Sequence, residues 1–133
     1  MILVDTNVWI DYLNGTDNGY SSRLDNALWQ GSVIQGDLIY LEILQGISSD
    51  RQYKLTKEKL DYLDCYDLFG PDMVHECAQN FRYLRRRGIT TRSTTDVIIA
   101  SFCILNGISL LSRDKDFIPF QKYLSLSLIT VNA

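Results

Sequence analysis

Residues 1–13 read MILVDTNVWIDYL, and the order of apolar and polar residues in this stretch decides the fold. Ile2, Leu3 and Val4 form a short apolar run that is typical of a buried strand. From Val8 onward the apolar residues recur with the spacing of a helix. Asp5 therefore stands at a corner between two buried elements, where a lone carboxylate is costly unless it is paired.

The rest of the chain alternates between strand and helix patterns. Strands are predicted at 2–5, 32–36, within 63–70, at 108–112 and at 126–130. Helices are predicted up to about residue 30 and closed by Gly31, then over 38–47, 50–63, 71–88 and 96–107, with a last one beginning near Asp114. Asp37 is the expected N-cap of the helix at 38–47, and Thr94 or Thr95 that of the helix at 96–107.

This alternation indicates an α/β fold. The strands lack an alternation of apolar and polar positions, which is typical of a parallel sheet covered by helices on both faces. At 133 residues, with no repeat and no low-complexity segment, the chain is expected to form a single domain over 1–133.

The composition narrows the class of protein. A hydrophobic fraction of 46% and a charged fraction of 22% are ordinary for a globular chain. No apolar run approaches the ~20 residues of a membrane span, and the N-terminus lacks the pattern of a signal peptide. We therefore expect a cytoplasmic protein without a membrane partner.

Cysteine and histidine argue against a disulfide framework and against zinc. Cys65, Cys77 and Cys103 are widely spaced in apolar surroundings and are expected to be reduced, buried thiols. His75 is the sole histidine and is expected at the surface. With no Cys-x-x-Cys pair, a zinc site is disfavoured.

The net charge of −3 is unusual for a protein that binds nucleic acid. A cluster of acids around a metal ion would account for it, because the cation supplies the missing positive charge while the exterior stays basic where needed.

Three more acids occupy unusual positions. Glu42 lies in a helix that is apolar nearly all round, so we expect it to be buried. Asp96 begins an apolar helix, where it could also simply complement the helix dipole, and Asp114 follows a predicted strand, where it could also cap the last helix. Because ligands bind at the carboxyl ends of parallel strands, Asp5 and these three acids are expected at one rim.

Four carboxylates at one rim need a countercharge. A hard divalent cation with oxygen ligands, Mg²⁺ or Mn²⁺, meets that need, as one or two ions. Thr6, Asn7 and Ser112 are suited to orient these carboxylates or bound water. For Thr6 and Asn7, plain helix capping is an equally good explanation.

The sequence as a whole resembles a PIN domain, and specifically the VapC ribonuclease toxins of type II toxin–antitoxin pairs. The resemblance rests on VDTNVWIDYL at 4–13, the helix that carries Glu42, and LRRRGITTRSTTDVIIASFCILNGISLLSRDKDF at 84–117. By this resemblance the family's acidic quartet falls on Asp5, Glu42, Asp96 and Asp114, with Asp116 as a further acidic position that could touch metal.

The resemblance implies a PIN-like three-layer α/β/α sandwich with a parallel sheet of four or five strands. It also implies an endoribonuclease dependent on Mg²⁺ or Mn²⁺, an RNA substrate such as transfer or ribosomal RNA, a small cognate antitoxin and a homodimer. With water as nucleophile, the products would carry 3′-hydroxyl and 5′-phosphate ends.

A basic stripe supplies candidate RNA contacts: Arg82, Arg85, Arg86, Arg87 and Arg92. The alternative for Arg85 to Arg87 is a solvated helix C-terminus stabilised by the dipole. Two other functions stay open: a PIN-like domain that binds RNA or protein without catalysis, and a metal-binding, receiver-like signalling domain. The second lacks the adjacent acidic pair and the strand-end lysine that it would need.

Overall fold

Five parallel strands form one sheet in the computed structural model, which describes residues 1–131. The spatial order is β3-β2-β1-β4-β5. The strands are β1 (Ile2–Val4), β2 (Val33–Gly36), β3 (Cys65–Tyr66), β4 (Ser109–Leu111) and β5 (Leu128–Ile129). The prediction of a parallel sheet of four or five strands is therefore confirmed.

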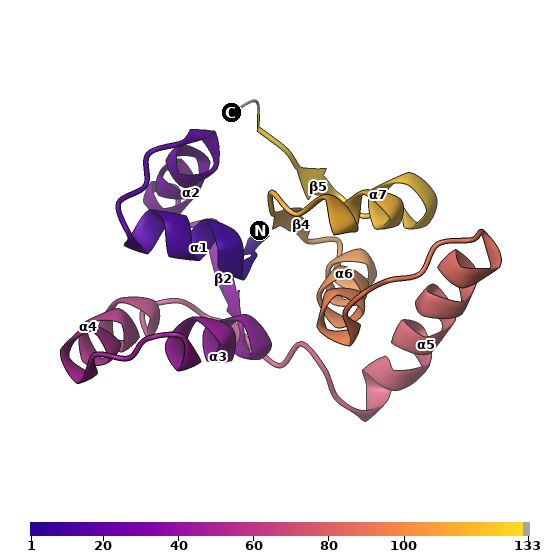
Figure 1. The fold of residues 1–133 in the computed structure, drawn as a ribbon, viewed down its shortest axis with the longest axis horizontal. Helices are drawn as coiled ribbons and strands as arrows, with labels where there is room; N and C mark the ends of the chain where they lie inside the picture. Colours follow the sequence, from indigo (N-terminus) through magenta and orange to yellow (C-terminus); the bar gives the residue numbers. More distant parts are fainter. Residues whose placement is uncertain (132–133) are drawn as a thin grey trace.

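Helices cover this sheet on two sides (Figure 1). One group comprises α1 (Thr6–Leu13), α2 (Gly19–Trp29), α3 (Asp37–Gln45) and α4 (Asp50–Leu60). The other comprises α5 (Pro71–Arg86), α6 (Thr94–Asn106), the short 3₁₀ helix η1 (Lys115–Phe117) and α7 (Ile118–Leu124). Within residues 1–131, no helix is both long and apolar enough to cross a membrane.

The centre of the sheet is a topological switch point. The chain runs outward from β1 through β2 to β3, and then returns to the other side of β1 with β4 and β5. β1 and β4 pair in register, with Val4 opposite Leu111. In open parallel sheets, the crevice beyond the carboxyl ends of two such strands is where ligands bind.

The central strands carry the core. Leu3, Val4, Leu110 and Leu111 have no measurable exposure. The edge strand β3 is exposed, and it contains Cys65, so the prediction of a buried thiol is wrong for that residue and right for Cys77 and Cys103. An edge strand of two residues has no neighbour on its outer side to cover it. His75 is exposed, as expected.

The cap of α3 differs from the prediction. Gly36 occupies the N-cap position, and Asp37 is the first residue of the helix. The Asp37 carboxylate instead accepts hydrogen bonds from the amides of Leu38, at 2.8 Å, and Leu68, at 3.0 Å. Asp37 thus ties the segment after β3 to the beginning of α3.

The helix α3 is also less buried than its apolar sequence indicates. Ile39 and Ile43 face the core, whereas Leu41 is 56% exposed. The helix lies in an outer layer, so one side of it meets solvent, and Glu42 is half-buried rather than buried.

The cap of α6 is Ser93 and neither Thr94 nor Thr95. The Ser93 hydroxyl accepts a hydrogen bond from the amide of Asp96 at 3.4 Å. The helix therefore begins at Thr94, earlier than its apolar run, and Asp96 lies in its first turn.

Gly36 provides a test of the packing between β2 and the segment after β3. A Cβ atom at this position would lie 2.6 Å from Cγ and 2.7 Å from Cδ2 of Leu68, and still closer to Cδ1. Since Leu68 is fully buried in the core, we expect Gly36→Ala to lower the free energy of unfolding by about 2 kcal/mol.

Urea unfolding followed by circular dichroism measures this loss. Gly46→Ala is the matched control, because a Cβ at Gly46 would meet the carbonyl oxygens of Glu42 and Ile43 at an ordinary 3.6 Å. Equal stability of the two variants would contradict the tight contact between Gly36 and Leu68.

Candidate metal centre

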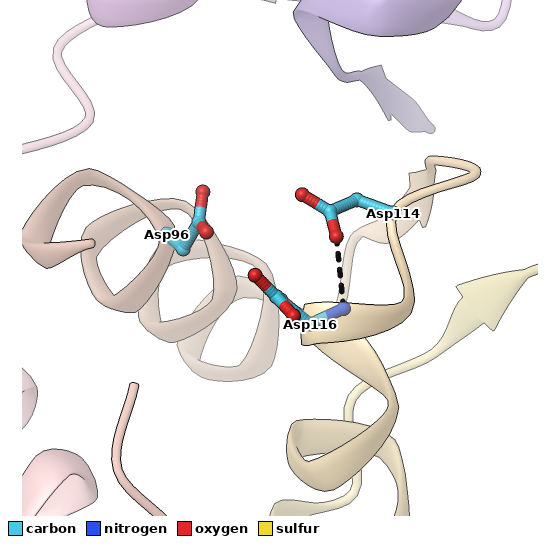
Figure 2. A group of neighbouring side chains, drawn as sticks. All are labelled: Asp96, Asp114 and Asp116. Atoms are coloured by element: carbon cyan, nitrogen blue, oxygen red, sulfur yellow. Dashed lines mark hydrogen bonds between the residues drawn. The ribbon is translucent and has the colours of Figure 1, made fainter. Parts of the chain in front are cut away.

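Three carboxylates converge at the switch point. Oxygen atoms of Asp96, Asp114 and Asp116 all lie within 4.8 Å of one another. Figure 2 shows Asp96 on the first turn of α6, facing Asp114 and Asp116 from the segment that follows β4. Residues 18 to 20 positions apart in sequence thus meet because α6 and β4 are consecutive elements.

Local hydrogen bonds fix the segment that carries two of these acids. Asp114 is the N-cap of η1, and its Oδ1 accepts a hydrogen bond from the amide of Asp116 at 2.9 Å (Figure 2). The amide of Asp114 in turn donates to the hydroxyl of Ser112 at 3.1 Å. Capping of η1 by Asp114, one of the two roles predicted for it, therefore coexists with its place in the cluster.

Asp5 belongs to the same rim through a second set of hydrogen bonds. It follows β1 directly, caps α1, and is only 8% exposed. Its Oδ1 accepts from the amide of Thr6 at 2.9 Å, and its Oδ2 accepts from the Ser112 hydroxyl at 2.8 Å. The Asn7 amide donates to the same Oδ2 at 3.4 Å. Ser112 thus links Asp5 after β1 to Asp114 after β4.

The carboxylates act on one another electrostatically. Burial raises the pKa of Asp5, despite the hydrogen bonds from Ser112 and Thr6, and the charge of Asp114 raises it further. Burial and the charge of Asp5 raise the pKa of Glu42. Burial, with the charges of Asp5, Asp114, Asp116 and Glu42, raises the pKa of Asp96 to about 6.

In the structure the four acids of the predicted quartet influence one another's pKa, but they do not all belong to the group of closest carboxylates. Asp116, predicted only as a further acidic position, is in the tightest group, whereas Asp5 and Glu42 lie outside that group. The charges of Asp5 and Glu42 raise the pKa of Asp96, and the charge of Asp5 also raises the pKa of Glu42, so both acids interact electrostatically with this group. Sequence offered one sign of the role of Asp116, namely its spacing of two residues from Asp114 within RDKDF.

The donor set fits a hard divalent cation. The five acids at the rim all offer carboxylate oxygens, and within residues 1–131 none of them is ion-paired with a basic side chain. Oxygen-only ligands suit Mg²⁺ and Mn²⁺ and disfavour zinc. Such an ion would be held by Asp96, Asp114 and Asp116, with Asp5 beside them.

Two buried polar atoms next to Asp5 lack partners. Thr6 Oγ1 and Asn7 Oδ1 are inaccessible and make no hydrogen bond within residues 1–131. Buried oxygen atoms of this kind are uncommon in folded proteins, since leaving one unpaired is costly. No partner within residues 1–131 holds these two oxygen atoms, and the orienting role of Thr6 and Asn7 stays a prediction.

The arginines predicted to contact RNA lie on α5 and on the segment that joins it to α6. Arg82, Arg85, Arg86, Arg87 and Arg92 are all exposed, four of them at or beside the end of α5. The Arg87 guanidinium lies 3.4 Å from the centre of the Tyr83 ring and donates to the Tyr83 carbonyl at 3.2 Å. Arg87 is therefore engaged by its own helix, as the dipole explanation anticipates for the end of α5.

Comparison with known proteins identifies the architecture. A family model described as PIN domain matches residues 2–122. The chain belongs to the PIN domain family. VapC ribonuclease Mb1587 of Mycobacterium bovis and ribonuclease VapC11 of Mycobacterium tuberculosis are each 28% identical to this PIN domain over 119 residues, which cover 88% of this chain and 89% of each relative.

Solved structures share the fold of this PIN domain. VapBC2 from Rickettsia felis, bound to a DNA fragment from its promoter, matches with a TM-score of 0.74 and 19% identity, covering 99% of this chain and 100% of that one. FitAcB from Neisseria gonorrhoeae matches with a TM-score of 0.73 and 19% identity, covering 98% and 97%. The predicted fold and family resemblance are thereby confirmed.

The raised pKa of Asp96 predicts how the free energy of unfolding of the metal-free protein, measured in EDTA, depends on pH. A pKa that rises from 3.8 to about 6 on folding means that the folded protein binds more protons than the unfolded chain between these values. Stability from this group is therefore present at low pH and lost as pH rises through about 6. We expect Asp96→Asn to raise the free energy of unfolding at pH 7.5 by about 1 kcal/mol, a figure reduced for solvent screening, and by less at pH 4.5.

Urea titrations at both pH values check this. Asp64→Asn is the control, because it removes one exposed carboxylate at the amino end of β3, at the opposite end of the sheet from the rim. A loss of stability of the same size at both pH values in Asp96→Asn would contradict repulsion within the cluster.

Proposed function

We propose that this PIN domain is a metal-dependent endoribonuclease and the toxin of a toxin–antitoxin pair. The observation that carries the proposal is the group formed by Asp96, Asp114 and Asp116 at the switch point, coupled to Asp5 and without a basic partner within residues 1–131. The names of the relatives from the two Mycobacterium species, both ribonucleases, support the reaction class.

The chemistry requires a cation and a positioned water. A bound Mg²⁺ or Mn²⁺ ion, or two, would act as a Lewis acid toward the scissile phosphate and neutralise the negative charge that develops there. Asp96, Asp114 and Asp116 would hold the cation, and Asp5 and Glu42 would complete the acidic rim. Ser112 fixes the Asp5 carboxylate by its 2.8 Å hydrogen bond, so that this group does not have to reorient during the reaction.

Hydrolysis then follows from proton transfer at the rim. Asp96 or Asp114 accepts a proton from the attacking water, whose oxygen forms the new bond to phosphorus. The bond from phosphorus to the ribose 3′-oxygen breaks, and that oxygen takes up a proton. The products carry a 3′-hydroxyl and a 5′-phosphate, because the 2′-hydroxyl takes no part.

The proposal also covers the substrate and the protein partners of this chain. RNA of the transfer or ribosomal class would meet the exposed arginines at the end of α5, which are suited to phosphate contacts. The VapBC and FitAcB structures share this fold, and by analogy with them we propose a small cognate antitoxin that binds and inhibits this chain. A homodimer and a cytoplasmic location are part of the same proposal, and exposed apolar residues such as Ile10, Leu41 and Val74 provide surface for protein contacts.

Incubation with total bacterial RNA tests the activity. We expect discrete fragments in Mg²⁺ or Mn²⁺, none in EDTA, and 5′-phosphate ends that permit direct ligation of an adaptor. Asp96→Asn and Asp5→Asn should lower the cleavage rate by more than about 100-fold, since mutation of groups one step further from a metal already costs 10–100-fold.

Asp64→Asn, which keeps the rim intact, should cleave at the wild-type rate. Thermal unfolding of each variant separates loss of the site from loss of the fold, and Asp5→Asn should stay folded. Fragments that form equally in EDTA, or that end in a 2′,3′-cyclic phosphate, would contradict the metal-dependent mechanism.

Antitoxin binding has its own test. The small protein encoded beside this chain, added in equimolar amount, should abolish the cleavage and co-elute with the chain on size exclusion. A protein that binds RNA without cutting it in Mn²⁺ would instead be a non-catalytic PIN-like module, the alternative that the intact set of acids disfavours.

A further inference from the structure

One basic side chain beside the acidic rim, that of Arg113, has no role in the function proposed above. Arg113 lies between Ser112, whose hydroxyl binds Asp5, and Asp114, a member of the three-carboxylate group. Ser112 is 1% exposed and accepts a hydrogen bond from the Asp114 amide. The backbone on either side of Arg113 is thus held in place.

The side chain of Arg113 is held as well. Its Nε donates to Asp11 Oδ2 at 3.1 Å, and this is one of two ion pairs within residues 1–131. Asp11, on α1, is largely buried, with 16% of its side chain exposed, and the same Oδ2 accepts a hydrogen bond from the Asn18 amide at 3.2 Å. The anchor of Arg113 is therefore itself fixed to the beginning of α2.

Charged residues of the segment from Ser112 to Asp116 contact two different helices. Asp114 and Asp116 face Asp96 of α6 (Figure 2), whereas Arg113 is paired with Asp11 of α1. A guanidinium is thereby held on the α1 side of the carboxylate group. An RNA strand bound at that group would present a neighbouring phosphate to one side or the other.

The guanidinium has donors to spare. Arginine carries five N–H donors, and only Nε makes a hydrogen bond within residues 1–131. Half of the side chain is exposed, and Nη1 and Nη2 form the fork that matches two phosphate oxygens.

We infer that Arg113, positioned by Asp11, contacts an RNA backbone phosphate next to the scissile one. The inference rests on the proposed ribonuclease function and adds a substrate contact on the α1 side of the carboxylate group. The contact is to the phosphate and is therefore independent of base sequence.

Binding to RNA in EDTA tests the contact without cleavage. The probe is a fluorescein-labelled, mixed-sequence, single-stranded RNA of about 20 nucleotides, and anisotropy is measured between 50 and 200 mM KCl. We expect Arg113→Ala to weaken binding about five- to tenfold at the lowest salt and to reduce the slope of log Kd against log salt by about 0.7. Arg113→Lys should recover the slope but only part of the affinity.

Lys115→Ala is the matched control. It removes the same charge from the same segment, but Lys115 makes no ion pair within residues 1–131, so its effect should be smaller than about twofold. Asp11→Asn should weaken binding although it makes the protein less acidic, because it frees the guanidinium. Equal effects of Arg113→Ala and Lys115→Ala, or unchanged binding in Arg113→Ala, would overturn the inference.

Steady-state cleavage supplies a readout that a structural role would not move. Against the RNA cut by the wild type, Arg113→Ala should raise KM by the same factor as Kd and leave kcat within about twofold, the pattern of a uniform binding contact. A fall in kcat with unchanged KM would overturn the contact. If the wild type binds the probe but cuts no RNA, the proposed function fails, while the salt slope still decides whether Arg113 binds the backbone.

Discussion

The hydrogen bond from Ser112 to Asp5 joins the ends of two neighbouring strands whose residues lie 107 positions apart. β1 and β4 pair along their length, and the Asp5 amide donates to the Leu111 carbonyl at 2.9 Å; beyond that point the polar ends meet through this contact, in which a buried hydroxyl donates to a buried carboxylate. The same hydroxyl accepts the Asp114 amide, so one side chain sets the relative position of both acidic segments. A site made by distant parts of the chain needs such a contact, because the hydrogen bonds within each segment do not position one segment relative to the other.

The order of elements could be predicted from sequence because short apolar runs alternate with helical spacing. Their ends could not, because they depend on contacts across the fold. Asp37 is a good N-cap by residue type, yet its carboxylate accepts the amide of Leu68, 31 positions away. Leu41 and Cys65 look apolar in sequence but lie in an outer helix and an edge strand, and neither fact is visible in the local pattern.

The acidic residues, too, could be predicted from sequence only in part. Asp5, Glu42, Asp96 and Asp114 stand out because charged residues interrupt apolar segments, and the resemblance to PIN domains selects the same four. Sequence did not indicate that Asp116 would join Asp96 and Asp114 in the tightest group, since that depends on the turn of η1. Arg113 escaped notice for a related reason: its partner Asp11 lies on a helix about 100 residues earlier in the chain.

The switch point also has a consequence for biosynthesis. The first 90 residues contain β1, β2 and β3 but only two of the five rim carboxylates, Asp5 and Glu42. The group formed by Asp96, Asp114 and Asp116 exists only once α6, β4 and η1 have packed beside β1. A chain still growing on the ribosome therefore cannot assemble this rim until synthesis has passed Asp116, and any activity of the rim begins only after that point.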